Sequence, residues 1–168
     1  SYRRSQDLAQ TVLTVHPENG GAKRFVVQGL EDEADRLLAM GRGQDALSNY
    51  RAALKLVETM VAADPSSPEA RSDLALLHDR VGGMVLRMGD PDAALASLRE
   101  ALGLREAVAA EHPDSTLYRE WTATVHTHIG DAYDWSRRPT EALASYRRGL
   151  EIWEAVAGAD PRNARAKR

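Results

Sequence analysis

The chain has 168 residues, of which 28% are charged and 43% are hydrophobic, and its formal net charge is −3. A charge so close to neutral argues against nucleic-acid binding, which typically uses a strongly basic face. No run approaches the roughly 20 apolar residues that a membrane-spanning helix needs. The lack of cysteine excludes a disulfide framework and any thiolate metal site or nucleophile.

A period of 48 residues runs through the whole chain and is marked by Pro17, Pro65, Pro113 and Pro161. A period between about 20 and 50 residues is typical of solenoids and propellers, in which each unit buries its apolar face against its neighbours. Between the prolines, small, apolar and charged residues recur in the same phase. The clearest columns are Ala46, Ala94 and Ala142, then Leu47, Leu95 and Leu143, then Arg51, Arg99 and Arg147.

The period sets the expected domain organisation. We expect the second helix of a truncated repeat, three full repeats, and the start of a further repeat or a tail. The corresponding segments are residues 1–17, 18–65, 66–113, 114–161 and 162–168. The sequence begins inside a unit and ends a few residues after the fourth proline. We therefore expect it to be a piece of a longer protein.

Each full unit is predicted to form two helices. Apolar residues recur at spacings of three and four, as in Ala94, Leu98 and Ala101, which places a stripe on one helical face. No run favours strands, which excludes propellers of similar period. The expected helices lie near 2–15, 21–40, 44–63, 68–88, 91–111, 115–136 and 140–159.

The sequence also predicts where these helices begin and end. The two helices of a unit are separated by residues 41–43, 89–91 and 137–139, where glycine can adopt the left-handed conformation that ends a helix and proline suits the first turn of the next. After the proline that closes a unit, either Ser66 or Ser67, and either Asp114 or Ser115, can cap the following helix.

The residue types at these phases resemble the tetratricopeptide repeat. That family carries a small residue and a large residue three positions later in its first helix, then an Ala, an aromatic and a second Ala in its second helix. The matching sets are Ala34, Leu37, Ala46, Tyr50 and Ala53, then Gly82, Val85, Ala94, Leu98 and Ala101, then Gly130, Tyr133, Ala142, Tyr146 and Gly149. The resemblance implies an all-α fold, a right-handed α-solenoid of antiparallel helix pairs, with longer helices than the usual unit. Long units of this kind look like those of bacterial signalling and regulatory proteins.

The resemblance also implies a concave groove lined by the first helices, in which a peptide or a partner helix lies. Its expected positions give an acidic end, a middle with arginines and a Trp near the far end, which suits a basic or aromatic-anchored partner. These positions are Gln28, Glu31, Asp32, Asp35, Asp79, Arg80, Arg87, Thr124, Thr127, His128, Asp131, Asp134 and Trp135. A clamp for a C-terminal carboxylate is not expected, because Glu31, Asp79 and Thr127 stand where the family's clamp needs Lys.

Catalysis finds little support in the sequence. No glycine-rich phosphate loop follows a strand, and no nucleophile accompanies a recognisable base motif. His78 and His126 occupy equivalent positions and are expected to be packed or half-buried. A metal site could be assembled from His128, Asp131 and Asp134, but the simpler expectation is a non-enzymatic chain without metal or cofactor.

A second hypothesis is self-association. The last predicted helix offers Tyr146, Leu150, Trp153 and Val156 at helical spacing, and no later helix of this sequence covers them. The sequence therefore predicts a protein-interaction scaffold in the cytoplasm with a protein or peptide partner and neither nucleic acid nor membrane. A homodimer through the C-terminal helix is the alternative.

Overall fold

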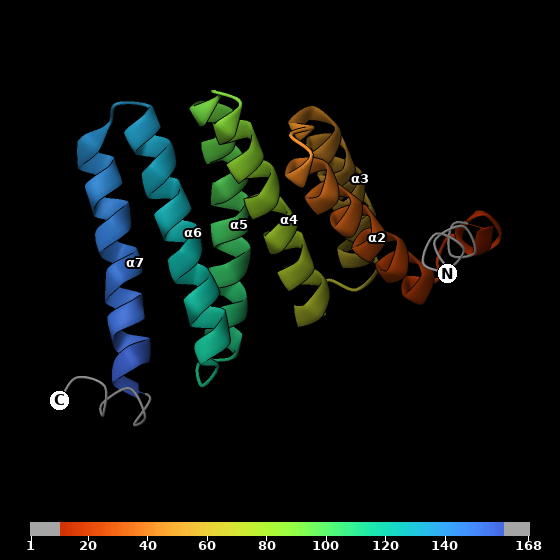
Figure 1. Ribbon diagram of the computed structural model, residues 1–168. Helices are drawn as coiled ribbons and strands as arrows, with labels where there is room; N and C mark the ends of the chain where they lie inside the picture. Colours follow the sequence, from red (N-terminus) through yellow and green to blue (C-terminus); the bar gives the residue numbers. More distant parts are fainter. Residues whose placement is uncertain (1–10, 160–168) are drawn as a thin grey trace. The chain divides into compact units, whose positions relative to one another are not determined.

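The computed structural model describes residues 11–159, and within that range the regular structure is entirely helical (Figure 1). Residues 11–15 are helical, and six long helices follow. They are α2 (Gly20–Ala39), α3 (Gly43–Ala63), α4 (Pro68–Arg87), α5 (Pro91–Glu111), α6 (Thr116–Trp135) and α7 (Pro139–Ala159). The chain divides into two compact units, with the boundary between Val81 and Gly82 inside α4. Each unit is described by itself.

The expected helices are confirmed, because each end of α2 to α7 lies within one residue of the predicted position. The first predicted helix, near 2–15, is helical over residues 11–15, and its earlier part lies outside the described residues. Within residues 11–159, no helix combines the length and the apolar character needed to span a membrane.

The turn inside each helix pair repeats the same hydrogen-bonded motif. After α2, the N–H of Gly41 donates to Leu38 O at 2.9 Å and that of Arg42 to Leu37 O at 2.8 Å, which is a Schellman cap. The same two bonds end α4 and α6. The residue in the left-handed conformation is Gly41 (φ 74°), Gly89 (φ 88°) or Arg137 (φ 56°). The third turn therefore places a residue with a Cβ where the first two use glycine.

The start of each first helix is also built alike. The side chains of Asn19, Ser67 and Ser115, which are 48 residues apart, accept hydrogen bonds from the backbone N–H three residues later. Of the cap alternatives left open by the sequence, the structure uses Ser67 and Ser115. These shared caps and turns fix the register of the helix pairs, since they satisfy backbone groups that the helix itself leaves unbonded.

The core of each unit is formed by the small and apolar columns of the period. In the first unit, α2 and α3 pack against each other and bury Ala34, Tyr50 and Val57. In the second unit, α6 packs on both α5 and α7 and shares a core with them (Figure 1). The close approach of Gly82 of α4 to Leu98 of α5 depends on the absence of a side chain, because a Cβ on Gly82 would lie 2.7 Å from Leu98 Cγ.

Candidate functional site

The expected groove positions of the first unit gather carboxylates on α2 and α4. Burial raises the pKa of Glu31, and Asp73 on α4 raises it further, whereas Arg80 on α4 opposes the shift. Asp32 and Asp35 on the same helix as Glu31 add to the crowding. The charged groups that act on Glu31 are thus three carboxylates and Arg80, and this balance favours a positively charged partner.

Two of these side chains also have partners inside the unit. Gln28 Nε2 donates to Asp32 Oδ1 at 3.0 Å, and the Tyr50 hydroxyl donates to Asp35 Oδ1. Tyr50 is 1% exposed, and burial followed by its bond to Asp35 raises the pKa of its hydroxyl. Asp35 therefore anchors the second helix of its pair as well as contributing charge to the surface.

The expected positions of the second unit lie mainly on α6. Asp131 Oδ1 accepts a hydrogen bond from the Tyr146 hydroxyl at 2.8 Å, and burial together with this bond raises the pKa of Tyr146 to about 12. Thr124 and Thr127 donate to carbonyl oxygens of their own helix. Trp135 is the most exposed apolar side chain of α6, with 61% of its surface accessible.

The expected groove positions of the second unit thus differ in how exposed their side chains are to solvent. Arg87, Asp134 and Trp135 are exposed, and His128 is half-buried. His78 and His126, expected to be packed or half-buried, are both half-buried. Across residues 11–159, no three His, Cys, Asp or Glu side chains come together as metal ligands.

The residues of the predicted self-association stripe on α7 differ in their exposure. Leu150 and Trp153 are 57% and 41% exposed, but Val156 is 7% exposed, and Tyr146 bonds to α6. At about 100° per residue, Val156 lies about 120° around the helix from Leu150, at the edge of the stripe, whereas Tyr146 lies between Leu150 and Trp153. Leu143, at 48% exposure, belongs with Leu150 and Trp153 on the outward face. Whether this face binds another copy stays a prediction.

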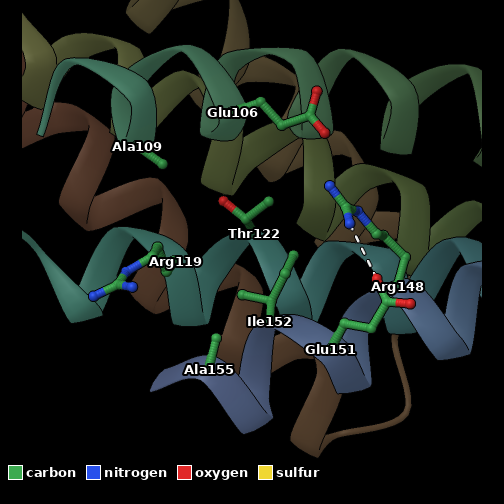
Figure 2. Close-up of a pocket in the computed structure, with 8 residues that line it drawn as sticks. All are labelled: Glu106, Ala109, Arg119, Thr122, Arg148, Glu151, Ile152 and Ala155. Atoms are coloured by element: carbon green, nitrogen blue, oxygen red, sulfur yellow. Dashed lines mark hydrogen bonds and ion pairs between the residues drawn. The ribbon is translucent and has the colours of Figure 1, made fainter. Parts of the chain in front are cut away.

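Sequence reasoning missed a cleft in the second unit that is lined by residues of α5, α6 and α7 (Figure 2). Its volume is about 340 Å³. It is lined by Glu106, Ala109, Arg119, Thr122, Arg148, Glu151, Ile152 and Ala155. A signal was present in the period, because small Ala109 and Thr122 stand where the preceding repeat has Val61 and Leu74.

Arg105 precedes the cleft residue Glu106 in α5, and His126 of α6 lies near the Glu106 carboxylate. The Arg105 guanidinium is buried and lies 4.5 Å from the centre of the Trp121 ring, a cation–π contact. His126 Nε2 lies 3.9 Å from the Glu106 carboxylate. Burial lowers the pKa of His126 and the charge of Arg148 adds to this, although Glu106 opposes both.

The helix pairs, with their repeated caps and glycine or arginine turns, define an α-helical repeat protein. Two sequence models of the tetratricopeptide repeat match, one over residues 31–82 and the other over residues 79–114 and 122–163. The chain belongs to the tetratricopeptide repeat family, whose repeats generally mediate contacts between proteins. The predicted all-α solenoid fold is thereby confirmed.

Solved structures of similar fold are known, although the curated sequences contain no match. The crystal structure of BtubC (BKLC) from P. vanneervenii is similar over 95% of this chain and 59% of its own, with a TM-score of 0.68 and 16% identity. The chain thus spans less than two thirds of BtubC. A mutant of MamA matches over 90% of this chain and 97% of its own (TM-score 0.36, 21% identity), and a second MamA structure over 95% of each chain (TM-score 0.30, 21% identity).

Proposed function

We propose that this chain is a non-enzymatic protein-interaction module that binds a basic peptide or partner helix through the first helices of its pairs. The observation that carries the proposal is the crowding of carboxylates on α2 and α4, where Arg80 is the one cation acting on Glu31. A basic segment would relieve this repulsion and lower the pKa of Glu31 toward its ordinary value. The module works as a preformed surface, because a rigid helical scaffold loses little conformational entropy on binding.

The proposal can be tested with a capped peptide of alternating lysine and leucine and its counterpart with glutamate in place of lysine. We expect saturable binding of the lysine peptide by calorimetry, weakening as salt is raised. The double variant Glu31→Gln/Asp73→Asn should bind at least about tenfold more weakly, or about 1.4 kcal/mol. Glu33→Gln is the matched control, since Glu33 lies on α2 but pairs with Arg36. Equal binding of both peptides would contradict the proposal.

The context of the module is part of the proposal. The long 48-residue units favour a regulatory or signalling role within a larger bacterial protein, and the lack of cysteine suits the reducing cytoplasm. The 59% coverage of BtubC is compatible with such a context.

A second candidate function is self-association through α7. Leu143 and Trp153 are 48% and 41% exposed, whereas the residues 48 positions earlier, Leu95 and Arg105, are 2% and 5% exposed. In the second unit α6 covers α5, and Trp121 of α6 stacks on Arg105. The exposed face of α7 therefore corresponds, in the repeat, to the face of α5 that α6 covers. A second copy of the chain would bury this face of α7.

Light scattering over a wide concentration range tests this candidate. We expect a dimer for the unaltered chain and a monomer for Trp153→Glu. Trp135→Glu is the matched control, because Trp135 is an exposed Trp on a different helix and its replacement should leave the mass unchanged. A monomer at every concentration would exclude self-association and leave the first helices as the interaction surface.

A further inference from the structure

The cleft between α5, α6 and α7 has two chemically different ends. In Figure 2, Arg119 and Arg148 lie at opposite ends, with Thr122 and Ile152 between them. Arg148 is already paired, because its guanidinium bonds to the Glu151 carboxylate at 3.0 Å. The Nε–H of Arg119 is buried and donates no hydrogen bond to any residue in the described range. One end of the cleft therefore carries a positive charge that has not been neutralised.

The repeat itself shows that this state of Arg119 is exceptional. The basic column formed by Lys23, Arg71 and Arg119 recurs every 48 residues. Lys23 Nζ lies 3.6 Å from the Glu18 carboxylate. Arg71 donates to the carbonyl oxygens of Ser66 and Ser67, at 3.4 Å each. The first two basic residues thus have local acceptors, and the third is left facing the cleft without one among residues 11–159.

The position of Arg119 on its helix adds to the preference for an anion. It is the fourth residue of α6, close to the helix end that carries partial positive charge. An anion bound there would interact favourably with both the guanidinium and the helix terminus. The opposite end differs, because Glu106 and Glu151 outnumber Arg148.

The middle of the cleft is apolar and open because its side chains are small. Ala109 and Thr122 replace the Val61 and Leu74 of the preceding repeat, and Ile152 and Ala155 complete the apolar lining. A volume of about 340 Å³ is at the lower end of the range for ligand sites, roughly 300–1,000 Å³. It is enough for an aliphatic side chain and a neighbouring carboxylate.

We propose that this cleft is a second interaction site, which binds a protein segment carrying an acidic residue beside an aliphatic one. The carboxylate pairs with Arg119, and the aliphatic side chain lies over Ile152 and Ala109. The site is separate from the acidic surface of α2 and α4, and its charge preference is opposite to that of the acidic surface.

Two-dimensional amide NMR of the full chain, titrated with the capped tripeptide acetyl-Glu-Leu-Leu-amide, tests the site. We expect saturable shifts centred on Arg119, Thr122 and Ile152. The peptide with Gln in place of Glu should bind about tenfold more weakly, since the charged hydrogen bond is lost. Equal affinity of the two peptides, or no saturable shift at these residues, would overturn the proposal.

Variants taken from the repeat itself separate binding from folding. Arg119→Gln should abolish the preference for Glu over Gln, and Arg119→Lys should restore most of it. Thr122→Leu, which copies Leu74, should fill the cleft and stop binding of both peptides while the helical circular dichroism is unchanged. Arg71→Gln is the control at the equivalent repeat position and should leave binding intact. A loss of binding in Arg71→Gln equal to that in Arg119→Gln would also overturn the proposal.

The outcome is independent of the proposed function of the acidic surface. Glu31→Gln/Asp73→Asn should leave the tripeptide titration unchanged, and Arg119→Gln should leave binding of the lysine peptide unchanged.

Discussion

Two helix pairs, α2–α3 and α6–α7, each contain a polar contact that the sequence of the pair between them lacks. In the outer two, a tyrosine of the second helix donates to an aspartate of the first, Tyr50 to Asp35 and Tyr146 to Asp131. In α4–α5 the same two positions hold Leu98 and Gly83. The repeat therefore tolerates either this polar pair or its absence, and equivalence in the period does not imply an equivalent role.

This comparison changes how the expected groove carboxylates are understood. Asp35 and Asp131 were expected to serve a partner, and each also holds the second helix of its own pair. Glu31 has a different character, because its raised pKa comes from burial and from neighbouring carboxylates. The residues that best separate binding from folding are thus Glu31 and Asp73 in the first unit and Arg119 in the second.

The largest effect should follow from adding a methyl group where a tyrosine packs on glycine. A Cβ on Gly130 would overlap the Tyr146 ring, whereas one on Gly82 would meet the flexible end of Leu98. We expect Gly130→Ala to lower the free energy of unfolding by about 1–3 kcal/mol in urea denaturation, and Gly82→Ala to cost less. Gly83→Ala is the control, since no atom lies within 4 Å, and should stabilise by up to about 1 kcal/mol. A neutral Gly130→Ala would mean that the ring moves aside at no cost.

The next largest effect on stability should follow from removing the tyrosine hydroxyl of each polar pair. Tyr50 is 1% exposed and its bond is to a carboxylate, so we expect Tyr50→Phe to cost about 1.5 kcal/mol of unfolding free energy. Tyr146 is only partly buried, and Tyr146→Phe should cost about 0.5–1 kcal/mol. Denaturant titrations of the single variants and of each with its Asp→Asn partner would measure the coupling. Equal losses of unfolding free energy in Tyr50→Phe and Tyr146→Phe would show that burial does not set the strength of the tyrosine–aspartate hydrogen bond.

Much of this fold follows from local chemistry, and the binding surfaces do not. The helix ends could be predicted because glycine, proline and capping serines act on the backbone beside them, as at Gly41 and Ser67. The low exposure of Val156 was not predicted, because spacing alone gives a helix's periodicity but not which neighbour covers which side. The Arg119 cleft was missed because its lining comes from three helices, α5, α6 and α7, and the period does not say which of their side chains meet.

A smaller effect of opposite sign is expected at the turn between α6 and α7. Arg137 adopts a φ of 56° where the other pairs use Gly41 and Gly89. A residue with a Cβ pays about 1–2 kcal/mol in this conformation, partly offset by the greater freedom of glycine in the unfolded chain. We expect Arg137→Gly to raise the free energy of unfolding by about 0.5–1 kcal/mol in urea denaturation. Gly89→Arg should lower it, and a destabilising Arg137→Gly would show that the arginine side chain holds the turn.

The smallest effect is a pH dependence specific to α6. Burial, with the charge of Arg148, lowers the pKa of His126 in the folded chain, so below the unfolded value of about 6.5 the unfolded state binds more protons. The stability contributed by neutral His126 is complete above that pH and is lost as the pH falls through the folded pKa. Arg148→Gln should raise the His126 pKa measured by imidazole proton NMR, and Glu106→Gln should lower it further. His126→Asn should remove this part of the acid sensitivity, and its persistence in that variant would assign the dependence to another group.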